Sequence, residues 1–332
     1  MQEELARLPY LGGRQSVEGY VHSPRSEQVK FGLNVINFGP EATPDALRAS
    51  VRWAEQAGFQ LAMVSDHVAV TPDVAQRYPA PFYEPFTCLA WLAGLTSAIE
   101  LGTTVVILPY RHPLLTARMA SNLDQLCGGR LVLGVGVGWA RAEFEALGLP
   151  FQRRGQLTDD YLIALHAHWS EQIATVQTAS VAFRDVDTRP APVRRSHPPV
   201  WVGGSSPAAI RRAARFGDGW HPLNASLDWL RQGLVLLREE AERCQRPMPA
   251  FVPRIKVRLT DALVSDPDRR PGQGTLDQVR RDLADLADLA ATYVVLDTYH
   301  GDPAELAEPS LAQHTLNVLL EHAIDPAGQM LR

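Results

Sequence analysis

The stretch LGTTVVILPYRHPLLTARMASNLDQLCGGRLVLGVGVGW, residues 101–139, decides the fold. It opens and closes with short apolar runs, 101–108 and 131–138, and carries a helical pattern over 114–127 that stops at Gly128-Gly129. Neither apolar run alternates with polar residues, so both predict strands that are buried on two faces. A helix between two such strands indicates a parallel crossover unit.

The same unit repeats along the chain in strict alternation. The expected strands are 31–38, 61–67, 101–108, 131–138, 199–204, a short one within 217–223, 251–260 and 292–298. The expected helices are 44–57, 85–98, 114–127, 152–170, 207–216, 226–244, 275–290 and 303–323. Eight units predict an α/β fold of the (β/α)8 TIM-barrel type. A doubly wound open sheet is the alternative, but no GxGxxG followed by an acidic residue supports it.

Two segments fall outside this repeat. Residues 1–29 are polar and interrupted by Gly and Pro, and they predict an N-terminal arm, with 30–332 as a single domain. Residues 174–197 are rich in Pro and Arg and predict an insertion before the fifth strand. The N-terminus has no apolar core of a signal peptide, and no apolar run reaches the length of a membrane span.

Charge and cysteine content narrow the class of protein. The net charge of -5 gives no basic surface for nucleic acid. Cys88, Cys127 and Cys244 lie far apart, without metal or redox spacing, which indicates a reducing, cytoplasmic setting. His166 and His168 are two residues apart on a helix and cannot share a ligand, so we expect no metal site.

In such barrels the active site lies at the C-terminal ends of the strands. His67 directly follows Ser65-Asp66 at the end of the second expected strand, where a histidine can move a proton near neutral pH. A hydrogen-bonded histidine without a catalytic role is the alternative. His112 and His221 each precede a proline, which favours turn positions.

Glycines at two further strand ends suggest room for a ligand. GGSSP (203–207) follows the fifth strand and opens a helix, whose free N–H groups could bind an anion such as phosphate. An ordinary turn with a serine cap is the alternative. Gly134, Gly136 and Gly138 alternate along the fourth strand and leave space for something flat, or else for tight internal packing.

Taken together, these blocks resemble a known family. VSDH (64–67), LGTTVVILPYRHP (101–113), LDQLCGGRLVLGVGVGW (123–139) with EFEALG (143–148), and PPVWVGGSSPAAIRRAARFGDGWHP (198–222) are similar to the luciferase-like flavin and deazaflavin oxidoreductases. The similarity runs in order from about residue 30 to 300 and is greatest to the branch that uses coenzyme F420. It implies a homodimer acting on a small-molecule substrate.

The resemblance also implies roles for individual residues. It places His67 at the reactive face of the cofactor and Asp66 at the cofactor's pyrimidine edge. It implies a non-prolyl cis peptide at Thr104-Val105 behind the ring system. The remaining implied cofactor contacts are the wall of the fourth strand and the phosphate loop: Gly136, Gly138, Trp139, Gly203, Gly204, Ser205 and Ser206.

Two departures from the family pattern bear on the substrate. In the F420-dependent sugar-phosphate dehydrogenases an acidic residue follows the glycines of the fourth strand, where this chain has Trp139. Those enzymes also carry a tryptophan where this chain has Thr71. Sugar-phosphate oxidation is therefore disfavoured, and Trp139 favours a hydrophobic or aromatic substrate.

Three functions are open at this point. The first is an F420-dependent oxidoreductase that transfers a hydride to or from an organic substrate, with His67 as the proton carrier. The second is a two-component monooxygenase that uses FMNH2 from a separate reductase. The third is a barrel that binds a flavin without catalysis.

Overall fold

The computed structural model describes residues 28–194, 196–266 and 269–332. The expected arm therefore lies outside the described residues, except for its last two positions. At the centre is a parallel sheet in the order β10-β9-β8-β5-β3-β2-β1-β14-β11. Its strands are β1 (Lys30–Asn34), β2 (Leu61–Val64), β3 (Glu100–Thr103), β5 (Leu131–Gly136), β8 (Val200–Gly203), β9 (Gly219–His221), β10 (Ala250–Phe251), β11 (Arg254–Lys256) and β14 (Tyr293–Asp297). The strands expected from the sequence are thus present, with shorter bounds.

The two outermost strands in this order, β10 and β11, belong to one short segment of the chain. This segment brings the two edges of the sheet together, so the sheet curls. β10 pairs with β9, and β11 pairs with β14. Only residues 252–253 separate β10 from β11. Successive strand residues face opposite sides. Accordingly, Leu61 and Met63 of β2 pack in a cluster inside the curl, whereas Ala62 and Val64 pack with the surrounding helices.

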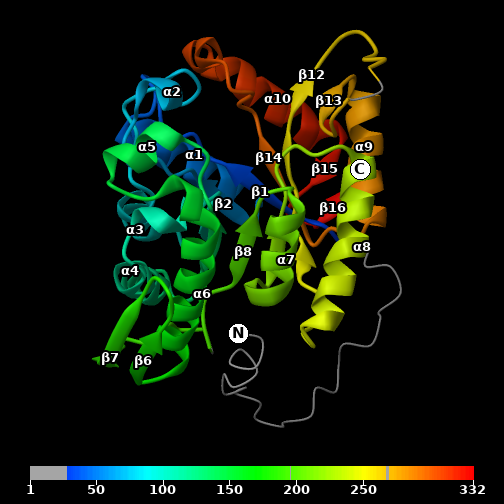
Figure 1. The fold of residues 1–332 in the computed structure, drawn as a ribbon. Helices are drawn as coiled ribbons and strands as arrows, with labels where there is room; N and C mark the ends of the chain where they lie inside the picture. The colour runs from blue at the N-terminus through cyan, green and yellow to red at the C-terminus, as the bar shows by residue number, and fades with distance from the viewer. Residues whose placement is uncertain (1–27, 195, 267–268) are drawn as a thin grey trace.

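Figure 1 shows the helices around the curled sheet. The longer ones are α1 (Pro44–Gln56), α3 (Pro85–Ala93), α4 (Pro113–Leu126), α6 (Arg154–Ser170), α7 (Pro207–Phe216), α8 (Leu227–Arg243), α9 (Leu276–Asp288) and α10 (Pro309–His322). Their starts follow capping rules. The side chains of Thr43, Ser206, Ser226 and Thr275 each accept a hydrogen bond from a backbone N–H in the first turn. These caps fix where each helix leaves the sheet.

Several segments differ from expectation. The third expected strand stops at Thr103 and resumes as β4 (Val106–Ile107), followed by a 3₁₀ turn, η2 (Leu108–Tyr110). The seventh is divided into β10, β11 and β12 (Arg258–Leu259), with Pro253, which lacks an N–H, in the first gap. β12 pairs with β13 (Gln273–Gly274). The last expected helix is divided into η4 (Pro303–Ala307) and α10, which begins at Pro309.

Other segments were not expected as regular structure. Residues 173–187 form an antiparallel hairpin of β6 (Ile173–Gln177) and β7 (Ala182–Asp187). The loops after β2 and β5 contain the short helices α2 (Pro72–Ala75) and α5 (Arg141–Ala146), with η3 (Phe151–Arg153) before α6. A second hairpin, β15 (Ile324–Asp325) and β16 (Met330–Leu331), ends the chain. None of the helices among the described residues combines the length and apolar character needed to cross a membrane.

Candidate active site

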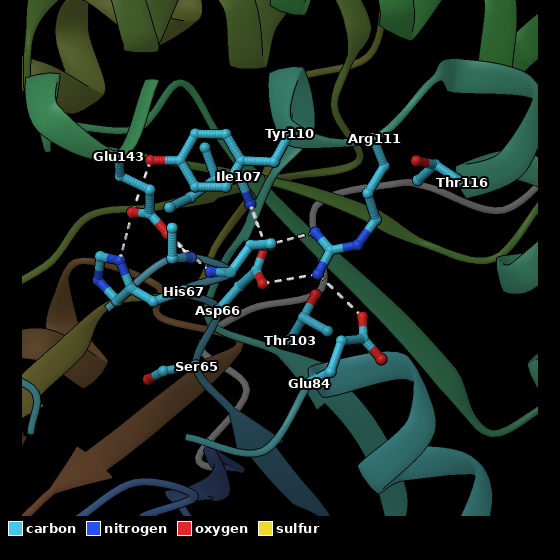
Figure 2. A network of polar contacts seen from close by, with 12 residues as sticks. Ser65, Asp66, His67, Glu84, Thr103, Ile107, Tyr110, Arg111, Thr116 and Glu143 are labelled. Carbon is cyan, nitrogen blue, oxygen red and sulfur yellow. Dashed lines mark hydrogen bonds and ion pairs between the residues drawn. The ribbon is translucent and has the colours of Figure 1, made fainter. Parts of the chain in front are cut away.

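His67 and Glu143 form a buried pair at the C-terminal ends of β2 and β5 (Figure 2). His67 Nδ1 lies 2.7 Å from Glu143 Oε2. The other carboxylate oxygen accepts from the backbone N–H groups of Val68 at 2.6 Å and Ala69 at 2.9 Å. A carboxylate can only accept, so Nδ1 must carry the proton. His67 is thereby fixed in the form that leaves Nε2 available to a ligand.

Glu143 stays ionised in spite of its burial. Burial raises its pKa, but hydrogen bonds from His67, Ala69 and Tyr110 lower it, and the net pKa is below the usual value. Tyr110 Oη donates to Glu143 Oε2 at 2.8 Å, and burial together with the nearby carboxylate raises the pKa of Tyr110. Tyr110 therefore remains a neutral donor, and Glu143 orients His67 as an ionised acceptor.

Aromatic rings surround His67. Tyr78 stacks on it with centroids 5.2 Å apart, and Phe82 and Trp139 meet it edge-on at 5.5 and 5.7 Å. Tyr78 and Phe82 come from the loop after β2, and Trp139 from the loop after β5. Trp139 remains 44% exposed, so this wall faces an open mouth. The structure thus brings together two predicted residues, His67 and Trp139, in apolar surroundings.

Asp66 is not free to contact a cofactor in this structure. Its carboxylate binds the Arg111 guanidinium through both oxygens at 2.8 Å and accepts from Ile107 N at 2.8 Å. Arg111 also donates to Glu84 (Figure 2). The Asp66 side chain is fully buried. Its geometry fits a role in fixing the segment after β4, rather than the contact with the cofactor's pyrimidine edge that the resemblance implies.

The peptide bond between Thr104 and Val105 is cis, as the resemblance implied. The neighbouring glycines make room for this bulge rather than for a ligand. A Cβ at Gly136 would lie 2.6 Å from Val105 Cγ2, and one at Gly203 2.9 Å from Val105 Cγ1. At Gly134 a Cβ would lie 1.9 Å from the Thr103 carbonyl oxygen. Of the two alternatives for Gly134 and Gly136, tight internal packing is confirmed and space for a ligand is not, because protein atoms fill it.

A network of buried polar side chains fixes the position of Thr104. Arg254 Nη1 donates to both the carbonyl and the hydroxyl oxygen of Thr104 at 2.8 Å. Thr104 Oγ1 lies 2.9 Å from His221 Nε2, and His221 Nδ1 lies 2.6 Å from the Val252 carbonyl. Since a carbonyl only accepts, Nδ1 is the protonated nitrogen and Nε2 accepts from Thr104. Arg254 is itself paired with Asp297 at 2.8 Å. His221 is thus a buried strand residue, not the turn residue expected.

Because His221 is neutral in the folded protein, we expect the protein to lose stability at acidic pH. Burial, with the nearby Arg254 charge, lowers the pKa of His221 to about 4, against 6.5 for an unperturbed histidine. Its stabilising contribution is complete above pH 6.5 and is lost as the pH falls toward 4, because only the unfolded chain then takes up the proton. On account of His221, the free energy of unfolding measured with urea should be about 2–3 kcal/mol lower at pH 4.5 than at pH 7. The His221→Gln variant should lose correspondingly less between the two pH values. An equal loss in both proteins would contradict the assignment.

The predicted phosphate loop opens α7. Ser206 caps this helix, accepting from Ala209 N at 3.2 Å. Gly204 has a left-handed backbone (φ 112°) that suits glycine. Ser205 lies just before the cap and its carbonyl accepts from Trp229 Nε1 at 2.8 Å. The N-terminus of α7 and the half-buried Gly203–Ser205 segment are thus placed at a strand end, where an anion could bind. Gly138, with φ 79°, packs against Ile107 and Phe144.

Sequence reasoning did not identify Glu143, Tyr110, Arg111 or Arg254 as site residues. A weak signal was available for Arg254, because a charged residue on a buried strand requires a partner, but Lys256 and Arg258 on the same expected strand did not single it out. Glu143 gave no signal of its own, since it lies on α5, 76 residues after His67. No cluster of His, Cys, Asp or Glu in the described part of the chain could hold a metal ion.

Comparisons with known proteins agree with this geometry. The profile of the luciferase-like monooxygenase family matches residues 27–270. An uncharacterized Mycobacterium tuberculosis protein is 29% identical over 265 residues, which is 72% of this chain and 92% of that protein. The F420-dependent hydroxymycolic acid dehydrogenase of the same species is 29% identical over 60% of this chain and 54% of its own length.

Further relatives include FMN-dependent enzymes. The FMNH(2)-dependent dimethylsulfone monooxygenase of Pseudomonas putida is 24% identical over 65% of this chain and 62% of its own length. A monooxygenase from Streptomyces bottropensis shares the fold, with a TM-score of 0.72 and 21% identity over 89% of this chain and 98% of that one. Because the family profile covers most of its length, this chain belongs to the luciferase-like monooxygenase family.

Proposed function

We propose that this chain is an F420-dependent oxidoreductase that transfers a hydride to or from a small hydrophobic or aromatic substrate. The observation that carries the proposal is His67 held by ionised Glu143, with Nε2 left available among aromatic rings. F420 supplies the hydride chemistry when bound. A runner-up is an FMNH2-dependent monooxygenase with a separate reductase, which the similarity to the dimethylsulfone monooxygenase supports.

The residues at the mouth of the sheet fit a flat cofactor with a phosphate. The bulge at Thr104-Val105 presents a wall backed by glycines, and the capped start of α7 offers a place for an anion. We propose Thr104, Val105, Trp139, Gly203, Gly204, Ser205 and Ser206 as the cofactor contacts. Gly136, Gly138 and Asp66 would act by shaping and holding this wall.

Each residue around His67 has a defined part in the proposed reaction. His67 would accept or donate a proton at Nε2, while Glu143 keeps Nδ1 protonated and balances the positive charge that forms on the ring. Tyr78, Phe82 and Trp139 would exclude water and favour an uncharged substrate over a charged one. Arg254 and His221 would hold Thr104 without touching the substrate.

Two structural proposals accompany this function. We infer that the curled sheet is a closed (β/α)8 barrel in a single domain, with 174–197 as its insertion, because β10 and β11 join its two ends. We also infer a homodimer. Trp91 of α3 and Leu115 and Leu126 of α4 are exposed apolar side chains on adjacent helices, and such surfaces favour association.

Replacing His67 should separate catalysis from binding. We expect His67→Ala to lower turnover by ~10²–10⁴-fold, the usual contribution of a positioned proton carrier, while the affinity for cofactor stays close to wild type. Steady-state rates on a substrate found by screening, together with cofactor titration, measure both. His112→Ala is the matched control, since His112 only caps α4. Unchanged turnover in His67→Ala would show that His67 is not the proton carrier, whereas cofactor binding without turnover in the wild type would favour the flavin-binding alternative.

Oxygen consumption distinguishes the two catalytic candidates. A deazaflavin reacts poorly with oxygen, so reduced F420 with this protein should consume no more oxygen than reduced F420 alone. A monooxygenase would couple FMNH2 oxidation to substrate hydroxylation, and oxygen uptake would yield oxygenated product. Product formation from FMNH2 and oxygen would overturn the F420 proposal.

A further inference from the structure

A separate cavity lies outside the curled sheet, beside the site described above. It has a volume of about 190 Å³ and lies where α1 and α10 pack over the paired strands β1 and β14. Most of its wall is apolar. The contributing side chains include Leu33, Val35, Ala46, Trp53, Leu306 and Leu316. We call this cavity the α1–α10 chamber.

The chamber is large enough for a small organic group. A cavity of ~150 Å³ lined by aliphatic and aromatic side chains stays dry and binds benzene. The α1–α10 chamber is somewhat larger, but it is partly open to solvent and its lining is mixed. Asn34, Glu41, Ser50, Thr298, Glu305 and Gln313 are polar, and the other lining residues are apolar or aromatic. An apolar ring or short chain would therefore gain contact area there that it lacks in water.

Charge sets the type of group that the chamber accepts. The ionisable carboxylates in its lining are Glu41 and Glu305, and none of the described lining residues is Lys, Arg or His. Glu305 is engaged by Arg258 and by the His300 backbone N–H at 2.7 Å, whereas Glu41 is exposed. An anionic ligand would face these carboxylates without a cation in the lining to offset them. The chamber thus favours a neutral group.

The chamber is divided from His67 by a layer of aromatic rings. Phe38 and Tyr299 line it. On their other side both rings meet Tyr78, with centroids 5.2 and 6.0 Å away, and Tyr78 stacks on His67. Tyr299 Oη also donates to the Arg77 carbonyl, which holds this layer in place. The chamber and the mouth are therefore neighbours with a common wall, not one continuous pocket.

We propose that the α1–α10 chamber is a second ligand site, which binds a neutral aromatic or short aliphatic group of about benzene to indole size. The site is independent of the proposed cofactor function, because none of its lining residues is among the proposed cofactor contacts. Its occupant meets Trp53, which supplies an optical signal.

Bromobenzene is the probe, since its heavy atom quenches tryptophan fluorescence on contact. We expect saturable quenching in the wild type that is reduced in Trp53→Phe. Ala46→Leu should abolish this saturable quenching by filling the chamber. Ala49→Leu, an exposed position on the same helix, should retain it. 4-Bromobenzoate at pH 7 should bind at least tenfold more weakly than bromobenzene.

Each outcome decides the proposal. Absence of saturable quenching in the wild type, or quenching that survives Ala46→Leu, would overturn the chamber as a ligand site. Equal binding of 4-bromobenzoate would overturn its charge preference. Saturating bromobenzene should leave F420 affinity unchanged, and competition would show that the chamber belongs to the cofactor site. If F420 does not bind at all, the proposed function fails while the Ala46→Leu comparison still tests the chamber.

Discussion

The free energy of unfolding of the Glu143→Ala variant should be about 3–5 kcal/mol lower than that of the wild type, because several buried hydrogen-bond donors lose their charged acceptor together. The variant leaves His67 Nδ1, Tyr110 Oη and the backbone N–H groups of Val68 and Ala69 without their acceptor. Each of these donors is buried or half-buried, so water replaces the carboxylate poorly. The loop after β2, which carries Tyr78, should loosen with them.

Urea unfolding at pH 7 measures this loss. Glu145→Ala is the matched control, because Glu145 is exposed on the same short helix and should change stability by less than about 0.5 kcal/mol. Glu143→Gln keeps an acceptor for the two backbone N–H groups and should lose less than the alanine variant. A Glu143→Ala protein within about 1 kcal/mol of the wild type would show that this carboxylate does not organise the site.

The second large effect is expected at Gly134, where alanine should cost about 4 kcal/mol or more, in the range of the most damaging substitutions. The added Cβ would lie 1.9 Å from the carbonyl oxygen of Thr103 on the neighbouring strand β3. That strand is held by its pairing with β5 and by the Thr103 hydroxyl, which donates to the Gly134 carbonyl at 2.7 Å. Backbone in such a position cannot move aside as a flexible side chain could.

Alanine variants at two further glycines serve as comparisons for Gly134→Ala. Gly203→Ala should cost less, because its Cβ meets the Val105 side chain at 2.9 Å rather than a backbone atom. Gly94→Ala should be nearly neutral, since the nearest atom lies 3.6 Å away and the backbone is already helical. Circular dichroism with urea unfolding gives all three values. Similar stability of Gly134→Ala and Gly94→Ala would refute the close approach of β3 and β5.

Most of the fold could be predicted because its signals are local. Apolar runs such as 131–136 mark strands buried on both faces, and caps such as Thr43 before Pro44 mark where helices begin. Breaks within strands could not be predicted from the residues themselves where their cause is tertiary, and at Thr104-Val105 only the family resemblance implied the cis peptide. The interruption after Thr103 depends on a bulge that packs against glycines of two other strands, and no residue next to it signals that packing.

The candidate site could be predicted only in part, for a related reason. His67 was singled out because it lies at the end of an expected strand, and Trp139 because it departs from a family pattern; their roles stay predictions. Glu143 and Arg111 were missed because their roles depend on distant partners, His67 and Asp66. The alternating glycines were noticed, but the sequence could not say whether a ligand or Val105 would fill the space beside them.

The central claim is that the mouth beside His67 binds a deazaflavin. Its most direct test is a titration of the purified protein with oxidised F420 and, separately, with FMN, followed by tryptophan fluorescence in the wild type and in Trp139→Phe. We expect tight, saturable quenching by F420 that is diminished in Trp139→Phe, because Trp139 lies beside His67 at the open mouth. Saturable quenching by FMN alone, or no binding of F420, would contradict it.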